Sequence, residues 1–217
     1  MNATIRKGLI FVALGVVAVA GATVALASTT LSTPSLDGQY AKAHSDDSSF
    51  TTKDLICPSN YRVDTVAFRP TSWGIYGSVS RVEIECISPT GRSTSVKTAG
   101  FSSTTWDDST PLGTRQGCNW DEKYIDGLKV VYDNYVKDAQ LHCATTATAT
   151  EDGEVLWPQE WAGWVLSESS YTDGNDDSEE LRCNAGKVMT GLRLRYRSDA
   201  DEIAVTRVQL YCSTISF

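Results

Sequence analysis

Apolar and polar side chains alternate along several short segments of the chain. Leu192, Leu194 and Tyr196 alternate with three arginines, and residues 128–132 repeat this pattern. A period of two, enriched in β-branched and aromatic residues, is typical of half-buried antiparallel strands. No stretch after residue 27 sustains a helical stripe, and Gly, Asp, Asn and Ser interrupt the chain often, as turns between strands do. The pattern predicts an all-β domain.

This alternation recurs in three units, each of which begins and ends with a cysteine. The repeat cores are 57–86, 118–143 and 183–212, and their opening cysteines lie 61 and then 65 residues apart. The closing strands share apolar positions two and four residues before the final cysteine: Val82 and Ile84, Ala139 and Leu141, and Val208 and Leu210. The opening strands correspond as well: Val66 and Phe68 match Leu192 and Leu194, and Leu128 and Val130 match after a shift of one residue. A repeat of this period is a signal of overall architecture.

Six cysteines allow 15 pairings in principle. If the three units are equivalent, each opening cysteine pairs with the closing cysteine of its own unit. The predicted bridges are Cys57–Cys86, Cys118–Cys143 and Cys183–Cys212. Each would close a loop of 25 to 30 residues, which stabilises a fold by roughly 3 kcal/mol. Metal ligation by cysteine is disfavoured, because no pair has C-x-x-C spacing and the chain has only two histidines.

Two connectors separate the units, at residues 87–117 and 144–182. Both are too long to be structureless loops in a compact domain, so we expect them to contain further strands. Each unit would then form a sheet of three or four strands. Three such sheets around a pseudo-threefold axis would bury their apolar faces together and protect their edges.

The N-terminal residues 1–27 have the organisation of a signal peptide. Arg6 and Lys7 precede an uncharged, mostly apolar run, and Ala25-Leu26-Ala27 forms a small-x-small cleavage site. The run is also long enough to serve as an uncleaved membrane anchor, which is the alternative. In either case the rest of the chain faces an oxidising compartment, where disulfides persist. We expect residues 28–52 to be a flexible lead-in, or partly an edge strand near Phe50, and residues 53–217 to form one three-repeat domain.

The chain is acidic, with a formal net charge of −8. After residue 27 it has 17 basic and 27 acidic residues, a net charge of −10, and no basic cluster. Such a chain repels phosphate backbones, so nucleic acid is excluded as a partner. It has no second long apolar run, so we expect no stable membrane insertion once the signal segment is removed.

The third unit resembles the repeat of vitelline membrane outer layer protein I and its secreted relatives. The resemblance rests on an opening cysteine, two glycines, an acidic loop and a Leu-x-Cys closing strand, preceded by tryptophans: Cys183, Gly186, Gly191, Asp199, Asp201, Glu202, Val208, Leu210 and Cys212, with Trp161 and Trp164 ahead. The first unit shares Cys57-Pro58 and the closing strand, and the second shares Gly127 and the closing strand. The resemblance covers about 160 residues and implies a β-prism. It also implies a secreted protein linked to glycans or to an extracellular coat.

Catalytic residues are not indicated. His44 lies in the lead-in and His142 on the outward face of a strand, equivalent to Glu85 and Tyr211, whereas a serine triad needs a histidine held by a carboxylate. Carboxylate pairs suited to glycoside hydrolysis exist, but we interpret them as solvated charges: Asp107 and Asp108, Asp176 and Asp177, and Asp201 and Glu202. The acidic run 173–180 does not match an EF-hand loop, and whether it binds calcium stays open. We predict no cofactor and no metal site.

Aromatic residues are the best candidates for ligand binding. Trp73 and Tyr76 lie in the loop of the first unit, Tyr132 and Tyr135 flank the loop of the second, and Trp157, Trp161 and Trp164 precede the third. Aromatic rings stack on the apolar faces of sugars, while neighbouring Asp, Asn and Gln side chains bind hydroxyl groups. The alternative for the three tryptophans is core packing, since Trp supplies a large buried area.

These features together predict a secreted, non-catalytic recognition protein that binds glycans of a cell wall or extracellular coat. One alternative is a structural or interaction protein of an extracellular layer, which would bind coat proteins. A second alternative is a carboxylate-dependent carbohydrate-active enzyme. We expect recognition at the loop ends rather than on the sheets, because binding residues concentrate on loops of rigid scaffolds.

Overall fold

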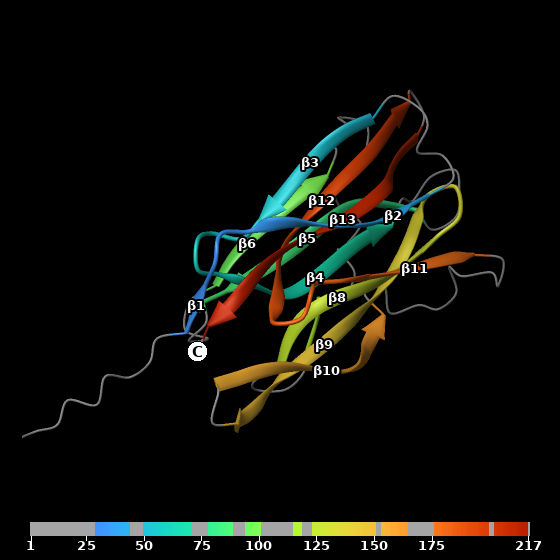
Figure 1. Cartoon of the computed structure of the whole chain (residues 1–217). Coiled ribbons are helices and arrows are strands. Elements are labelled where there is room, and N and C mark those ends of the chain that lie inside the picture. Colours follow the sequence, from blue (N-terminus) through green and yellow to red (C-terminus); the bar gives the residue numbers. More distant parts are fainter. Residues whose placement is uncertain are drawn as a thin grey trace, which may run out of the picture.

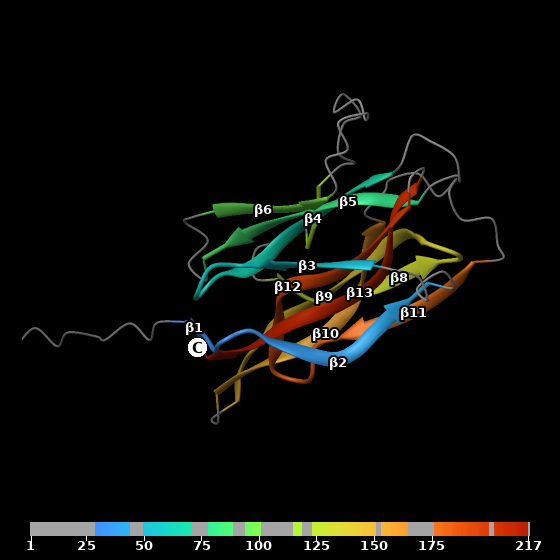
Figure 2. The ribbon, with the colours of Figure 1, turned by 90° about the horizontal axis from the view of Figure 1, so that it is seen from above.

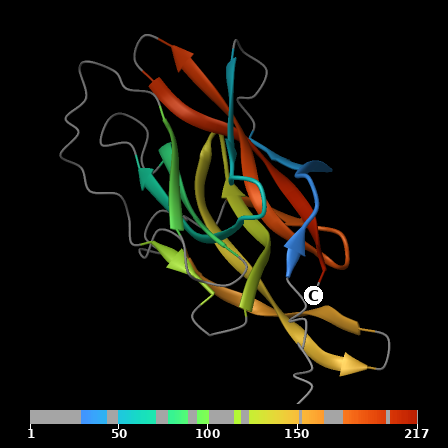
Figure 3. The same cartoon turned by 90° about the vertical axis from the view of Figure 1, so that its left-hand side faces the viewer.

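The computed structural model describes residues 29–43, 50–70, 78–88, 94–100, 115–118, 123–150, 153–164, 176–199 and 202–216. Within these ranges the chain forms thirteen β-strands and no helix, arranged in three antiparallel sheets. The all-β prediction is therefore confirmed, and the sheets surround a main apolar core in a β-prism-like fold (Figures 1, 2 and 3). None of the described segments contains a helix suited to spanning a membrane.

Each repeat core supplies the two central strands of one sheet. Sheet I has the order β6-β5-β4-β7, with β4 (Arg62–Pro70), β5 (Val79–Ile87), β6 (Thr94–Gly100) and β7 (Gln116–Gly117). Sheet II has the order β10-β9-β8-β11, with β8 (Lys123–Tyr132), β9 (Val136–Thr150), β10 (Gly153–Trp164) and β11 (Asp177–Arg182). Sheet III centres on β12 (Lys187–Asp199) and β13 (Glu202–Ser216). The prediction that both connectors hold further strands is confirmed by β6, β7, β10 and β11.

Sheet III is completed by the N-terminal part of the chain. Strand β3 (Phe50–Ile56) pairs with β12, while β1 (Thr30–Leu31) and β2 (Ser35–Lys42) pair with β13. The edge strand expected near Phe50 is β3, whereas β1 and β2 are strands in a segment for which a flexible lead-in was the expectation. The reason is that β13 and β12 each expose an edge, and N-terminal strands satisfy both edges. Figure 2 shows β2, in blue, beside the C-terminal strand β13.

The chain passes from one sheet to the next at each opening cysteine. Cys57 follows β3 of sheet III but is bonded to Cys86 of β5 in sheet I. Cys118 follows β7 of sheet I and is bonded to Cys143 in sheet II. Cys183 follows β11 of sheet II and is bonded to Cys212 in sheet III. The three predicted pairings are confirmed, and each disulfide joins two sheets at a corner of the prism.

A β-bulge recurs at the same place in every unit. The register shifts around Asp64 in β4, Asp126 in β8 and Thr190 in β12, so one extra residue stands in each strand. The carbonyl groups of Asp126 and Thr190 accept hydrogen bonds from the backbone N–H groups of Cys183 (2.8 Å) and Cys57 (2.9 Å). These two bulges therefore hold Cys183 and Cys57 where the chain turns from one sheet to the next.

The alternating apolar residues of all three sheets point inward and form a main core, and a smaller cluster contains Tyr124, Ala144, Val188 and Ile215. The largest fully buried side chains of the main core include Phe68 and Ile84 from sheet I, Leu128 from sheet II, and Leu192 and Tyr196 from sheet III. Burial raises the pKa of Tyr196 above its ordinary value. Since the inward side chains fill the prism, the outer faces and the loops remain for contact with other molecules.

Candidate functional site

The outer surface of sheet III carries two rows of polar and aromatic side chains that cross four strands. The first row runs Lys42–Arg207–Arg195–Thr52 and the second runs Tyr40–Gln209–Arg193–Asp54. Residues directly opposite one another, or two apart along a strand, share one face of a sheet. Between the rows three positions are fully buried, Ala41, Val208 and Leu194, while the fourth, Lys53 of β3, is exposed. We call these two rows, with Phe50 and Tyr211, the arginine–aromatic face.

Two arginines of the first row stack on aromatic rings at opposite sides of the sheet. The Arg195 guanidinium carbon lies 3.3 Å from the centre of the Phe50 ring, and that of Arg207 lies 4.4 Å from the centre of the Tyr40 ring. Cation–π attraction and contact with the arginine stem hold such pairs together. Tyr40 nevertheless remains 46% exposed and Phe50 43% exposed. The face thus presents rings whose positions are fixed and whose surfaces still meet solvent.

The second row is organised by a bidentate ion pair. Arg193 Nε and Nη2 donate hydrogen bonds to Asp54 Oδ1 at 2.7 Å and Oδ2 at 2.9 Å, and Nη2 also donates to the Tyr211 hydroxyl at 2.7 Å. The hydrogen bonds from Arg193 hold the pKa of Asp54 below its ordinary value, whereas burial raises the pKa of Tyr211. Gln209 donates to the carbonyl of Asp37 at 2.6 Å. These bonds make the centre of the face rigid and polar.

Outward charges of the strands are held by partners within the protein. Glu83, on the outer surface of sheet I, is only 6% exposed and is ion-paired with Arg115. Arg193 is fixed by Asp54 on sheet III. A flat, rigid surface of guanidinium groups, amides and exposed rings can bind a polar ligand by stacking and by hydrogen bonds, with little ordering cost.

Of the aromatic residues proposed from the sequence, the structure describes the side chains of two. Tyr132 is partly buried against the core, and burial, followed by the carboxylates of Glu179 and Asp177, raises its pKa. Tyr135 is only 4% exposed, and its hydroxyl accepts a hydrogen bond from Arg197 at 3.3 Å. Trp73 and Tyr76 lie outside the described residues. All four assignments as ligand-binding residues stay predictions.

The three tryptophans of the second connector lie on one edge strand, β10. Trp157 pairs with Thr145 of β9, Trp161 with His142, and Trp164 with Gln140. The structure thus brings the three residues together along one strand of sheet II, separate from the arginine–aromatic face on sheet III. Their role in binding stays a prediction.

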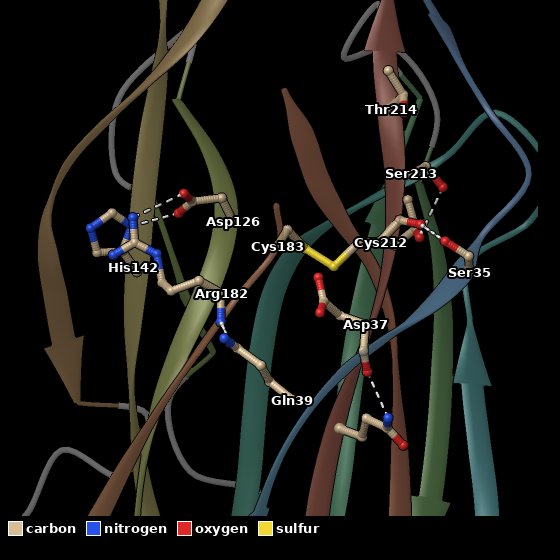
Figure 4. Close-up of a disulfide and its surroundings, with 12 residues drawn as sticks. Ser35, Asp37, Gln39, Asp126, His142, Arg182, Cys183, Cys212, Ser213 and Thr214 are labelled. Atoms are coloured by element: carbon tan, nitrogen blue, oxygen red, sulfur yellow. Dashed lines mark hydrogen bonds and ion pairs between the residues drawn. A yellow bond between two sulfur atoms is a disulfide. The ribbon is translucent and has the colours of Figure 1, made fainter. Parts of the chain in front are cut away.

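His142 has a carboxylate partner, which the sequence did not indicate. Its Nδ1 lies 2.5 Å from Asp126 Oδ1, and Arg182 Nη2 donates to Asp126 Oδ2 at 3.3 Å (Figure 4). The register confirms the predicted equivalence of His142, Glu85 and Tyr211, which lie opposite Gly127, Thr65 and Gly191. His142 is 4% exposed, so the pair is placed to stabilise sheet II rather than to receive a substrate from solvent.

Figure 4 also shows how Arg182 connects sheet II to sheet III. Its backbone N–H donates to Gln39 Oε1 of β2 at 3.1 Å, next to the bridge between Cys183 and Cys212. The side chain of Arg182 turns the other way, to Asp126 of β8. The corner that flanks the arginine–aromatic face is therefore fixed by a disulfide and by polar contacts.

Some acidic groups of the connectors are engaged within the protein. Lys137 donates to Asp176 at 2.7 Å and is ion-paired with Asp133 at 3.1 Å, and these hydrogen bonds raise its pKa in spite of burial. Within the described parts of the chain, no group of three or more His, Cys, Asp or Glu side chains is placed to hold a metal ion. The pairs Asp107–Asp108 and Asp201 with its neighbour cannot be placed, because Asp107, Asp108 and Asp201 lie outside the described residues.

The sequence analysis did not single out Tyr40 or Lys42, and it named Phe50 only as the place of an edge strand. A signal was present in the repeat. In the structure, strands β7 and β11 precede Cys118 and Cys183 and complete the sheet of the previous unit. By the same rule a strand should precede Cys57 and join the last unit, which places Phe50 on sheet III.

Comparisons with known proteins give no family for the chain. No protein-family model matches it, and no curated protein matches it. Among solved structures it is similar to the V. cholerae biofilm matrix protein Bap1, with 10% identity, a TM-score of 0.41, and coverage of 87% of this chain and 24% of that chain. It is similar to the mosquito-larvicidal Cry4Aa toxin from Bacillus thuringiensis, with 10% identity, a TM-score of 0.46, and coverage of 81% and 33%. It is also similar to Calystegia sepium agglutinin, with 12% identity, a TM-score of 0.34, and coverage of 86% and 97%.

The chain thus spans about a quarter of the length of Bap1 and a third of that of Cry4Aa. With TM-scores from 0.34 to 0.46, these likenesses assign neither a family nor a ligand. Relationship to vitelline membrane outer layer protein I stays a prediction from the sequence, while the three-sheet, three-disulfide architecture that it implies is present.

Proposed function

We propose that this protein is a secreted, non-catalytic recognition protein that binds glycans of a cell wall or extracellular coat on the outer face of sheet III. The observation that carries the proposal is the pair of exposed rings, Tyr40 and Phe50, each stacked against an arginine on a rigid sheet. Aromatic rings offer a flat apolar surface with few rotatable bonds, so a ligand that stacks on them loses little conformational freedom.

The distribution of exposed apolar side chains supports this surface. Among the described residues three large apolar side chains are exposed, and two of them, Tyr40 and Phe50, lie on the arginine–aromatic face. Gln209, Arg193 and Asp54 between them supply amide, guanidinium and carboxylate groups in one row. Sugars present apolar ring faces edged by hydroxyl groups, and this alternation of rings and hydrogen-bonding groups is complementary to them.

The cysteines support an extracellular location and a non-catalytic role. All six are in disulfides, which persist in oxidising compartments and leave no cysteine thiolate as a nucleophile. His142, which has the carboxylate partner of a general base, is buried. If the protein were an enzyme, its catalytic groups would have to be other than a cysteine or His142.

The test is a glycan array probed with the 28–217 fragment and with variants of the face. We expect binding to a defined set of extended glycans, and we expect Tyr40→Ala and Phe50→Ala to weaken it about tenfold each. Val96→Ala is the matched control, because Val96 is 47% exposed on β6 of sheet I. The melting temperatures of all three variants should stay close to that of the parent fragment.

Each contrary result points to a different reading. Absence of any glycan signal would contradict the proposal and favour a coat protein that binds protein partners. Release of reducing sugars from a bound polysaccharide would favour the carbohydrate-active enzyme. If binding is present but survives Tyr40→Ala and Phe50→Ala, the surface is wrong, and variants of Trp157, Trp161 and Trp164 test the strand β10 in its place.

A further inference from the structure

The two exposed rings of the arginine–aromatic face lie on opposite sides of sheet III and at different levels of its strands. Tyr40 of β2 is level with Asp54 of β3, because Gln209 and Arg193 connect them in one row. Phe50 lies four positions from Asp54 along β3. Three strand spacings of about 4.8 Å and four residue steps of about 3.4 Å give a diagonal of roughly 20 Å between the rings. This span is far longer than one sugar ring.

Arg207 and Arg195 fill the diagonal between the two rings. They lie directly opposite each other on β13 and β12, and each stacks on the ring nearest to it. A guanidinium group on one face of a ring leaves the opposite face and the ring edge toward solvent, and Tyr40 is 46% and Phe50 43% exposed. The two arginines therefore hold the rings in place, and the rings supply the surface that a ligand can contact.

The polar groups beside this diagonal are engaged within the protein. Arg193 donates two hydrogen bonds to Asp54 and one to Tyr211, and Gln209 donates to the carbonyl of Asp37. Breaking such bonds costs free energy unless a ligand returns equivalent ones. The opposite charges of Arg193 and Asp54 also neutralise each other, so this row favours neither a polyanion nor a polycation. Stacking on the two rings is therefore the main source of affinity that this face offers.

Two rings strengthen binding when one ligand reaches both. Once one ring holds a chain, the second contact is intramolecular and has an effective concentration on the order of millimolar when the chain matches the span. A stiff chain loses less conformational freedom in such a contact than a flexible one does. Sugars joined through equatorial bonds form a stiff, extended ribbon that exposes apolar ring faces along its length, whereas axial linkages make a chain curl. The separation of the rings thus favours the ribbon.

Resting on the glycan-binding function proposed above, we infer that the ligand of this face is an uncharged, linear polysaccharide with an extended, ribbon-like backbone, of the cellulose and chitin type. Tyr40 and Phe50 stack on two sugars of the same chain, several sugars apart. The chain is bound along its interior, since both contacts are with ring faces. Arg207 and Arg195 are positioning residues that fix the two aromatic rings at this separation.

The experiment varies chain length and backbone shape while the sugar stays the same. Calorimetry measures binding of the 28–217 fragment to cellobiose, cellohexaose and maltohexaose. Cellohexaose and maltohexaose contain the same sugars, but the first is extended and the second curls, while cellobiose is too short to meet both rings. We expect cellohexaose to bind at least tenfold more tightly than the other two, about the contribution of a second stacking contact. Chitobiose and chitohexaose repeat the length comparison with N-acetylated sugars.

Variants distinguish one spanning ligand from two separate sites. In Tyr40→Ala and in Phe50→Ala the affinity for the extended hexasaccharide should fall about tenfold, while that for the disaccharide changes by no more than about twofold, because either ring alone can hold a disaccharide. Val96→Ala, at an exposed position on β6 of sheet I, is the matched control and should bind both as the parent does. One hexasaccharide should bind per protein molecule.

Each contrary outcome overturns a different part of the inference. Equal affinity for the disaccharide and the extended hexasaccharide, or two hexasaccharides bound per protein, would mean that no chain spans the rings. Equal affinity for cellohexaose and maltohexaose would overturn the ribbon-like backbone. If neither cellohexaose nor chitohexaose binds while other glycans on the array do, the polysaccharide class is wrong and glycan binding stands. If no glycan of any kind binds, the proposed function itself fails.

Discussion

Gly191 is a position where the neighbouring strand leaves no room for a side chain. It lies beside the bulge of β12 and is flanked by Ile56 of β3 and Tyr211 of β13. A Cβ atom at this position would stand 2.3 Å from the carbonyl oxygen of Leu55, whereas ordinary contact begins at 3.4 Å. The atom that it meets belongs to the backbone, so β3 would have to move by about 1 Å.

That movement sets the expected cost of Gly191→Ala. Overpacking of this kind costs about 1–3 kcal/mol, and displacement of β3 weakens roughly one ladder hydrogen bond, worth about 1 kcal/mol. We therefore expect the free energy of unfolding to fall by about 2–4 kcal/mol. Gly127→Ala should behave alike, because a Cβ atom there would stand 2.5 Å from the carbonyl oxygen of Leu181.

The assay is urea unfolding with disulfides intact, followed by tryptophan fluorescence. Gly38→Ala in β2 is the matched control, since a Cβ atom there meets nothing within 4 Å. It should be neutral or stabilising by up to about 1 kcal/mol, because alanine restricts the unfolded chain. If Gly191→Ala and Gly38→Ala unfold at the same urea concentration, the close approach between β12 and β3 is not present in solution.

Three further predictions concern the bridges and ion pairs. Replacing Cys57 and Cys86 together by alanine removes a link across a separation of 29 residues and should lower stability by about 3 kcal/mol; unchanged unfolding would mean that the corner is held without it. Lys137→Ala leaves the buried Asp176 without its cation and should lower the free energy of unfolding by about 3 kcal/mol. Replacing both partners by apolar residues should lower it by less, and equal losses in urea unfolding would contradict this expectation. The pKa of Asp54 is lowered in the folded protein, so its ion pair with Arg193 stabilises the fold above pH ~4, and this contribution is lost as the pH falls below that value. The melting temperature of Asp54→Asn should therefore decline less over that range than that of the parent protein. An identical decline in both proteins would refute the stabilising role of this ion pair.

Much of the fold could be predicted from the sequence because the cysteines and the alternation are local signals. Leu192 and Leu194 mark the buried side of their strand without reference to any other part of the chain. Comparison of the three units then predicts the disulfides. The pattern within a unit does not show which segment pairs with each edge of its sheet. Residues 35–42 alternate only weakly between apolar and polar side chains, and they become a strand because β13 offers an edge to pair with.

The candidate site could be predicted only in part, for a related reason. Arg193 and Arg195 look equivalent along the sequence, since both are outward residues two positions apart. Their difference lies in the residues opposite them, Asp54 and Thr52, which are more than a hundred residues away. Cross-strand neighbours decide which groups a surface charge meets across the sheet, and register is set by tertiary structure.

The three units keep one framework and differ in chemistry at equivalent outward positions. Opposite the bulged strand, sheet I has Glu85, sheet II has His142 and sheet III has Tyr211. Glu85 is hydrogen-bonded to Thr65, His142 to Asp126 and Tyr211 to Arg193. A repeat needs only its inward residues, its bulge and its disulfide to fold, so selection is free to alter the outer faces one by one.

If the outer face of sheet III alone acquired a binding role, transfer of its two rows to sheet I of the same protein should transfer binding without loss of the fold. Failure of a correctly folded transfer variant to bind would mean that recognition requires more of sheet III than these two rows.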